Sequence, residues 1–316
     1  MKRKLNILIA CEESQACCRA FRQLGHNAFS CDLFDCSGTF FGEDKAPEPH
    51  PEWHFNHDVT TVLNKTDLTL QDGSQAVIEG DWDIMIGHPP CTFLAVSGAK
   101  WLYDPKDKSK PHPNFPNRRK DQEDGANFFM FLANADVKRI AIENPVGIMS
   151  SRWRKPDQSV QPYMFGDPYS KNTCLWLKNL RPLHPSKPTE DHGARIYFGS
   201  GKSQPLWYSD GLTKTKSKEE RQKWRSKTFP NIARAFAEQW TIQIAAEEKL
   251  LDNNEWDILG RDYLKILNEM TGGIRYKTST PDIQTEKKRY PTHFNPELVS
   301  EIEEREQRLI ELWNSK

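Results

Sequence analysis

The chain has 316 residues, of which 36% are hydrophobic and 28% are charged, and its formal net charge is zero. This length suffices for one large domain or two modest ones. The zero charge argues against a general basic nucleic-acid binder, so contact with nucleic acid requires locally gathered Lys and Arg. No run of about 18 apolar residues is present, and the first apolar run is too short for a signal peptide. We therefore expect a cytoplasmic protein with no membrane partner.

Seven cysteines are present, and none of them form a Cys-x-x-Cys pair. An odd number without a secretion signal predicts reduced thiols. Cys31, Cys36, His54 and His57 are of residue types that bind zinc, but their spacing matches no common zinc pattern. We predict no metal site.

Strand and helix signals alternate over residues 1–180. The apolar run 5–10 is typical of a buried parallel strand, and Ser14 and Gly25 are placed to begin and end a helix over 15–24. Further strands are predicted at 27–31, 83–87, 139–143 and near 173–178. A helix is predicted at 122–135, with Phe128, Phe129, Phe131 and Leu132 on its apolar face. The alternation predicts a doubly wound α/β fold with a mostly parallel sheet.

Several reactive side chains follow these strands. Glu12 and Glu13 come after the first strand, Asp32 after the second, and Cys91 and Glu143 after later ones. Ligands of such sheets gather outside the carboxyl ends of the strands. We expect a ligand site there.

The segments that follow the cysteine and the last strand are more polar. Residues 100–121 are rich in Lys, Arg and Pro, and are interpreted either as a solvated loop or as a mobile basic flap that grips phosphates. Residues 180–227 predict a small hairpin, and 230–248 predict one helix. In the tail, two helical faces are predicted, formed by Trp256, Leu259, Tyr263, Ile266, Leu267 and Met270 and by Leu298, Ile302, Leu309 and Trp313.

Cys91 and Glu143 form a chemically suggestive pair. Cys91 follows two prolines, which stiffen the chain, and nearby helix N-termini are expected to lower its pKa and favour the nucleophilic thiolate. Glu143 follows an apolar strand, and burial is expected to raise its pKa so that it holds a proton at neutral pH. A thiol facing such a carboxyl group suits addition to an unsaturated nitrogen ring.

Five sequence features follow one another along the chain. DIMIGHPPCTFLAVSGA and RIAIENP place Cys91 and Glu143 about fifty residues apart, with a predicted helix between them. Asp32 and Asp58 follow earlier strand signals, and FGDPYSKNTCLWL and TFPNIARAFAEQW come later. Together they resemble the motifs of the DNA cytosine-5 methyltransferases, and more specifically a compact subfamily common in bacteriophages and prophages. The resemblance covers about residues 5–242.

The resemblance implies a Rossmann-like S-adenosylmethionine-dependent methyltransferase acting on DNA, in the host cytoplasm if phage-encoded. Its parts are a catalytic domain at 1–178, a reduced target-recognition region at 179–227, a closing helix at 228–248 and a mostly helical extension at 249–316. Cys91 would add to C6 of a flipped cytosine and Glu143 would contact N3, with Asn144 and Lys171 in support. The implied cofactor-binding residues are Cys11, Glu12, Glu13, Ser14, Asp32, Leu33, Asp58, Val59, His88 and Pro90. The implied DNA-binding residues are Ser97, Lys100, Arg118, Arg119 and Lys120.

The chain departs from the family at three places. Cys11-Glu12-Glu13-Ser14-Gln15-Ala16 stands where the family has a glycine-rich motif, so side chains must replace close backbone approach to the cofactor. We expect Glu12 or Glu13 to pair with a positive group of the cofactor. Thr173 replaces an arginine of a later motif. The recognition region is small, although it contains Lys202, Lys214, Lys216, Lys218, Arg221, Lys223 and Arg225.

Two other functions fit these residues. The first is C5 modification of a free pyrimidine nucleotide or RNA, or transfer of a group other than methyl, which the small recognition region and zero net charge favour. The second is a catalytically inactive protein that binds DNA or S-adenosylmethionine, which the presence of both Cys91 and Glu143 disfavours.

Overall fold

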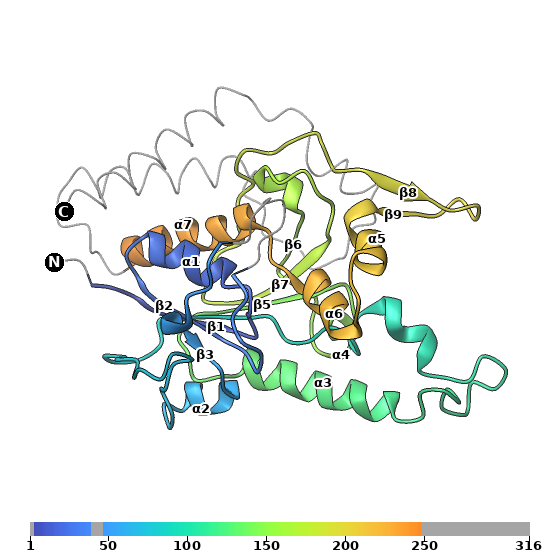
Figure 1. The fold of residues 1–316 in the computed structure, drawn as a ribbon, viewed down its shortest axis with the longest axis horizontal. Coiled ribbons are helices and arrows are strands. Elements are labelled where there is room, and N and C mark those ends of the chain that lie inside the picture. The colour runs from blue at the N-terminus through green and yellow to red at the C-terminus, as the bar shows by residue number, and fades with distance from the viewer. Residues whose placement is uncertain (1–2, 39–46, 248–316) are drawn as a thin grey trace.

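The computed structural model describes residues 3–38 and 47–247, and Figure 1 shows how their helices and strands are arranged. The two helical faces expected within 249–316 lie outside the described residues. Within the described ranges, no helix combines the length and the apolar character needed to cross a membrane.

A seven-stranded sheet forms the centre of the fold, in the order β3-β2-β1-β4-β5-β7-β6. Its strands are β1 (Asn6–Ala10), β2 (Asn27–Cys31), β3 (His54–Phe55), β4 (Ile84–Gly87), β5 (Ile140–Pro145), β6 (Gln158–Val160) and β7 (Thr173–Lys178). The first five are parallel, whereas β7 runs antiparallel to both β5 and β6. The predicted α/β class with a mostly parallel sheet is confirmed. The strand order reverses direction between β1 and β4, which is where doubly wound sheets bind ligands.

Helices cover both faces of this sheet. Helices α1 (Ala16–Gln23) and α7 (Pro230–Glu247) lie against one face, and α2 (Val59–Leu63) and α3 (Arg118–Ala133) lie against the other (Figure 1). Along β1, Ile7 and Ile9 join the α1 and α7 core, whereas Leu8 and Ala10 join the core beneath α3. Successive strand side chains point to opposite faces, so an uninterrupted apolar run is what a sheet covered on both sides requires.

The helix after β1 was predicted well, but its N-terminal cap was not. Gly25 has φ +82° and ends α1 as expected. Ser14 makes no capping bond, and the residue before the helix is Gln15. Glu12 takes this role instead, because its carboxylate accepts hydrogen bonds from the Cys17 amide at 2.7 Å and the Cys18 amide at 3.2 Å. A carboxylate is well suited to these unpaired donors at the positive end of a helix.

Helix α3 begins at Arg118, four residues before the predicted start at 122. Residues 118–120 therefore belong to its first turn and not to the preceding loop. Its buried side chains are Ala126, Phe129, Leu132 and Ala133. Phe131 is 40% exposed, so its assignment to the apolar face was wrong. The helical spacing places it on the opposite side from Phe129.

The chain between β7 and α7 contains more helix than expected. The predicted hairpin is present as β8 (Arg195–Tyr197) and β9 (Ser203–Pro205), and α7 matches the helix predicted at 230–248. Helices α5 (Leu206–Thr213) and α6 (Lys218–Ser226) were not predicted. The remaining elements are short: η1 (Pro51–Trp53), η2 (Val96–Trp101), α4 (Met149–Arg152) and η3 (Pro162–Phe165).

Candidate functional site

A cavity of about 370 Å³ lies at the reversal point of the sheet. This volume is within the usual range for a small-molecule site. Its walls come from the β1–α1 turn, the ends of β2 and β4, the start of α2, and the chain between α6 and α7. The structure brings together all ten residues expected at the cofactor, namely Cys11, Glu12, Glu13, Ser14, Asp32, Leu33, Asp58, Val59, His88 and Pro90.

The turn between β1 and α1 reaches an unusual backbone conformation without glycine. Cys11 has φ +61° and Gln15 has φ +60°, both in the left-handed region. Such a conformation costs about 1–2 kcal/mol at a residue with a Cβ atom. Gln15 offsets part of this cost through hydrogen bonds between its amide group and the main chain of His50, at 2.9 Å and 2.8 Å. The turn thus keeps a glycine-like path while presenting side chains to the cavity.

Glu13 carries the clearest sign of a missing ligand. Its Oε2 atom is buried and has no hydrogen-bond partner among the described residues. Burial raises the pKa of this carboxyl group, opposed by a hydrogen bond from Ser37 and by the charge of Lys223. A buried acceptor without a partner is costly. A cationic or hydrogen-bond-donating ligand would satisfy it.

Two further carboxylates stand at the same end of the sheet. Burial raises the pKa of Asp32, whose Oδ1 accepts a hydrogen bond from the Phe34 amide at 3.0 Å. Asp58 caps α2, and hydrogen bonds from the Thr60 hydroxyl and amide lower its pKa. Both can accept hydrogen bonds from ligand hydroxyl groups.

Eight further residues of the lining were not expected at the cofactor. They are Phe34, Phe128, Lys223, Ser226, Lys227, Thr228, Cys31 and His57. Lys223 was expected to contact phosphate, but its ammonium group lies 4.9 Å from the centre of the Phe34 ring. The TFPN stretch was the sequence signal that could have located this part of the lining, because it carries Thr228 two residues before the start of α7. The cavity is therefore lined by both acidic groups and two lysines, and the charges of Lys223 and Lys227 act on Glu13.

The loop that carries Cys91 is fixed to the loop that follows β5. The Cys91 carbonyl accepts the amides of Leu94 and Ala95 at 3.0 Å and 2.9 Å. Ala95 pairs with Gly147 in an isolated antiparallel bridge. A Cβ atom on Gly147 would lie 2.3 Å from the Leu94 carbonyl oxygen, so only glycine allows this approach.

Asn144 adds a second connection between the two strand ends. Its side-chain amide donates a 2.8 Å hydrogen bond to the carbonyl of Pro89, two residues before Cys91. Both Asn144 and Glu143 lie within β5, which continues two residues past the predicted end at 143. The structure thus joins the Cys91 segment directly to the strand that carries Glu143.

Glu143 is held between two basic side chains. Its Oε2 lies 2.5 Å from Nδ1 of His88, and its Oε1 lies 3.8 Å from the Lys171 ammonium group. Burial raises its pKa, but Lys171, His88 and Thr173 outweigh this effect and bring the pKa to about 2. The expectation that Glu143 holds a proton at neutral pH was wrong, because the sequence does not show that these partners surround it.

Cys91 also differs from expectation. Its pKa is raised, mainly by burial; Lys171 opposes this, and Glu143 adds to it. The expected lowering of its pKa was wrong, because burial of the thiol outweighs the groups that favour the thiolate. Among those groups are the positive charges of Lys171 and Arg225. Cys91, Glu143 and Lys171 thus form one electrostatically coupled group beside the cavity.

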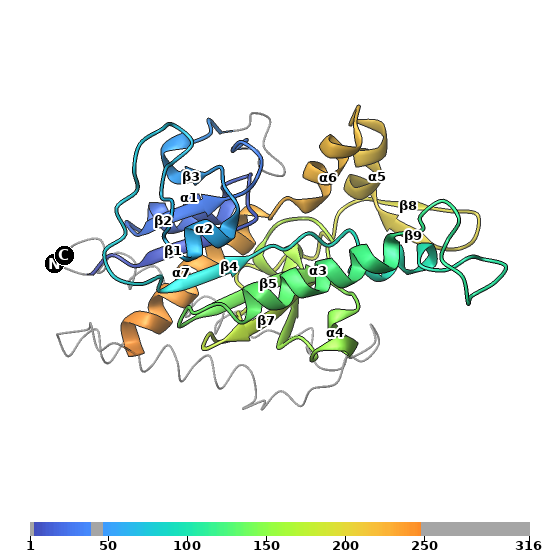
Figure 2. The ribbon, with the colours of Figure 1, turned by 90° about the horizontal axis from the view of Figure 1, so that it is seen from below.

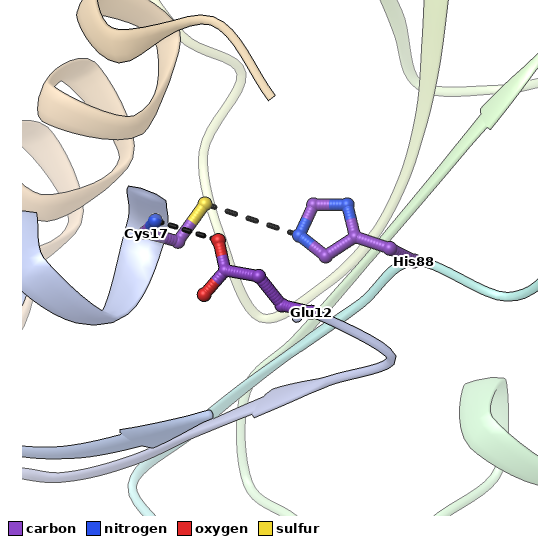
Figure 3. Close-up of side chains that lie close together, drawn as sticks. All are labelled: Glu12, Cys17 and His88. Carbon is purple, nitrogen blue, oxygen red and sulfur yellow. Dashed lines mark hydrogen bonds between the residues drawn. The ribbon is translucent and has the colours of Figure 1, made fainter. Parts of the chain in front are cut away.

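Figure 3 shows Glu12, Cys17 and His88, whose side chains lie close together. One potential ligand atom from each lies within 4.8 Å of the others. The hydrogen bonds of Glu12 to the α1 amides account for its position without an ion. Cys31, Cys36, His54 and His57, by contrast, do not form such a group. The two ring nitrogens of His54 are hydrogen-bonded to the Ser30 hydroxyl and to the Phe34 carbonyl.

The residues expected to contact DNA lie beyond Cys91. Ser97 and Lys100 are exposed on η2. Arg118 donates to the Thr92 carbonyl at 3.0 Å, and Arg119 lies over the Tyr103 ring. Lys120 pairs with Asp124 at 2.6 Å. Arg118 and Arg119 therefore hold the segment after Cys91 in place, while Ser97 and Lys100 face solvent.

No family model matches this chain, and comparison with curated proteins finds no match.

Proposed function

We propose that the protein is a DNA cytosine-5 methyltransferase that uses S-adenosylmethionine. The observation that carries this proposal is the coupling of Cys91 with Glu143 and Lys171 on two adjacent strand ends, directly beside the cavity. A thiol and a carboxylate in this arrangement suit attack on a pyrimidine ring from which charge must be withdrawn. The motif order of the sequence supports the same reaction.

The cavity residues fit S-adenosylmethionine. The unpaired Glu13 oxygen suits a positively charged group, and Asp32 and Asp58 suit the ribose hydroxyls. Lys223 and Lys227 suit a carboxylate, so the cavity complements a ligand that carries both charges. When bound, this cofactor supplies an electrophilic methyl group.

The protein side chains act on the cytosine ring. A target base must leave the duplex to reach a site of this depth. The Cys91 thiol loses its proton to solvent, and its sulfur bonds to C6 while the C5–C6 double-bond electrons become available at C5. Glu143 binds the N3 edge and the exocyclic amine, and Lys171 holds Glu143 in place. After C5 has gained a methyl group, it loses its proton to solvent, and the C6–S bond breaks to restore the thiolate.

The test is expression in a host that lacks cytosine methylation, followed by mass spectrometry of nucleosides from its DNA. We expect 5-methylcytosine with the wild type and none with Cys91→Ala. Cys36→Ala is the matched control, since Cys36 is another buried thiol and does not line the cavity. If the DNA of the host that expresses the wild-type protein contained no C5-modified cytosine, this would count against the proposal.

A second readout isolates the covalent step. DNA that contains 5-fluorocytosine cannot lose its C5 substituent as a proton, so the adduct with Cys91 persists. We expect a stable complex with the wild type and with Cys36→Ala, but not with Cys91→Ala. A group other than methyl would appear as a different mass on the trapped base.

A further inference from the structure

The His88 ring is in direct contact with Glu143. His88 follows β4 directly, and its main-chain amide donates to the Ala10 carbonyl at 2.9 Å, so the adjoining strand β1 fixes its position. Its Nδ1 lies 2.5 Å from Glu143 Oε2, and its side chain is only 9% exposed. No solvent layer separates the two groups at this distance.

The second ring nitrogen also faces a polar partner. Nε2 lies 3.9 Å from the Cys17 sulfur, next to the Glu12 carboxylate, as Figure 3 shows. The groups that face the ring are Glu12 and Cys17 on one side and Glu143 on the other, with Asp32 at longer range and Lys171 beyond Glu143. Both ring nitrogens of His88 therefore lie against groups that can accept a hydrogen bond.

The proposed reaction leaves one requirement open. When Cys91 adds to C6, negative charge develops on the ring, and a proton at N3 neutralises it. Glu143 is ionised in the free protein, so it has no proton of its own to give. A neighbour must supply one through Glu143.

We propose that His88 is this neighbour, a positioning residue that stores a proton and passes it through Glu143 to N3 of the target cytosine. The inference rests on the proposed function. The Nδ1–H bond of doubly protonated His88 breaks as the proton moves to Glu143 Oε2. The carboxyl proton then moves to N3 as the Cys91 sulfur bonds to C6. When the sulfur leaves, N3 returns its proton to Glu143 and then to His88, so atoms and charges balance over the cycle.

The reaction to measure is hydrogen exchange at C5 without cofactor. Reversible addition of Cys91 and protonation at N3 make C5 basic, so DNA labelled with tritium at C5 of cytosine releases its label to water. We expect the wild-type rate to fall on the alkaline side, where the proton for N3 is no longer supplied through Glu143, and on the acid side, where the Cys91 thiolate is lost.

His88→Asn is the main variant. Its amide nitrogen can donate a hydrogen bond to Glu143 but cannot transfer a proton. We expect a loss of about tenfold or more in exchange rate at pH 7 and disappearance of the alkaline fall. Glu12→Gln is the second variant: it keeps an acceptor for the α1 amides but removes the charge beside Nε2. We expect it to move the alkaline fall to lower pH.

His50→Asn is the matched control, because it removes a histidine–glutamate hydrogen bond, from His50 Nδ1 to Glu52 Oε1 at 2.8 Å, away from the cavity lining. It should leave the profile unchanged. Circular dichroism and DNA binding check that each variant is folded.

The outcomes separate the two proposals. If the wild type releases the label, two results for His88→Asn would overturn the role of His88 alone. One is an unchanged exchange rate, and the other is a rate lowered equally at every pH, so that the pH profile keeps its shape. A wild type that releases no label overturns both the proposed function and this inference. Loss of the alkaline fall in His88→Asn, with its displacement in Glu12→Gln, supports the relay.

Discussion

At the scale of single residues, Glu143 shows how partners distant in sequence set the charge of a buried group. Its pKa falls from 4.5 to about 2 because Lys171 and His88 outweigh burial. Since the pKa is lowered in the folded state, the resulting stability is present above pH 4.5 and is lost as the pH falls toward 2. It amounts to about 3 kcal/mol at most.

Lys171→Met should therefore weaken both stability and its pH dependence. Without the ammonium group, the buried Glu143 charge is less well compensated, and we expect the free energy of unfolding at pH 7 to fall by about 2 kcal/mol. Between pH 5 and pH 3, the variant should lose less stability than the wild type. Urea unfolding across this range measures both effects. Lys178→Met is the control, since Lys178 lies at the surface and donates to the Ala135 carbonyl. Parallel stability curves for wild type and Lys171→Met would contradict this account.

Glu13→Gln tests which part of the cofactor meets the unpaired Glu13 oxygen. If Glu13 pairs with the sulfonium group, the variant should bind S-adenosylmethionine about tenfold more weakly, with a smaller change for S-adenosylhomocysteine, which lacks that charge. Titration calorimetry with both ligands measures this difference. Equal affinity of Glu13→Gln and wild type for both ligands would show that Glu13 contacts neither.

At the scale of elements, the loops after β4 and β5 behave as one unit, because the Ala95–Gly147 bridge joins them. Gly147→Ala would place a Cβ atom against the Leu94 carbonyl and separate the loops. We expect C5 exchange to slow by about tenfold or more, because small displacements of reacting groups are costly. Gly125→Ala is the control, since its added Cβ would meet Leu94 at an ordinary 3.5 Å. An unchanged exchange rate in Gly147→Ala would show that the bridge does not position Cys91.

A second connection joins the beginning of β5 to the end of α7. Arg139 is 1% exposed, and its guanidinium group lies 2.7 Å from the Glu247 carboxylate. We expect Glu247→Gln to lower the free energy of unfolding by about 1–2 kcal/mol, because Arg139 stays buried with less compensation and Glu247 is partly in solvent. The double variant Arg139→Met/Glu247→Gln should be less destabilised than the sum of the single variants. Additive losses in chemical unfolding would argue against a direct interaction.

The elements that the sequence predicts correctly are those that local pattern determines. β1 is a nearly continuous apolar run, β2 is a short run of mostly buried residues, and the end of α1 is marked by Gly25. The start of α3 was misplaced because its first turn is charged and resembles the basic loop before it. Helix α5 was missed because LWYSDGLT carries few local helix signals. Helix α6 does carry one that was overlooked, since the Ser217 hydroxyl caps it and accepts the Glu220 amide at 3.0 Å.

Part of the cavity lining was predictable from sequence, namely the ten residues at the ends of β1, β2 and β4 and at the start of α2, whereas Phe128, Lys223 and Thr228 and the electrostatics of the site were not. Strand-end positions were enough to gather Glu12, Asp32 and Cys91 at one edge of the sheet. The pKa values of Cys91 and Glu143 depend on Lys171, which a separate strand region supplies. No local pattern shows that contact.

At the scale of the whole molecule, a neutral chain presents basic side chains locally. The segment between η2 and α3 projects at the same end of the molecule as the β8–β9 hairpin (Figures 1 and 2). Lys106, Lys108 and Lys110 are exposed in that segment. If DNA lies across this end, each lysine that contacts a phosphate releases a counterion.

The triple substitution of Lys106, Lys108 and Lys110 by Gln should weaken DNA binding and reduce its salt dependence. We expect the slope of log affinity against log salt concentration to decrease by about one for each lysine that contacts a phosphate. Fluorescence anisotropy at several salt concentrations measures the slope. Lys138→Gln is a control at an exposed position before β5. An unchanged slope in the triple variant would place the DNA elsewhere.

The lining of the cavity comes from opposite ends of the described chain, since residues 11–14 and the later residues 223 and 226–228 line the same space. During synthesis, the first part of this lining leaves the ribosome long before the second has been translated. A nascent chain therefore exposes Glu13 and Asp32 without the lysines that share the cavity with them. A ligand of this cavity can be captured only after α7 has docked beside α1, so ligand binding should stabilise the last step of folding rather than the first.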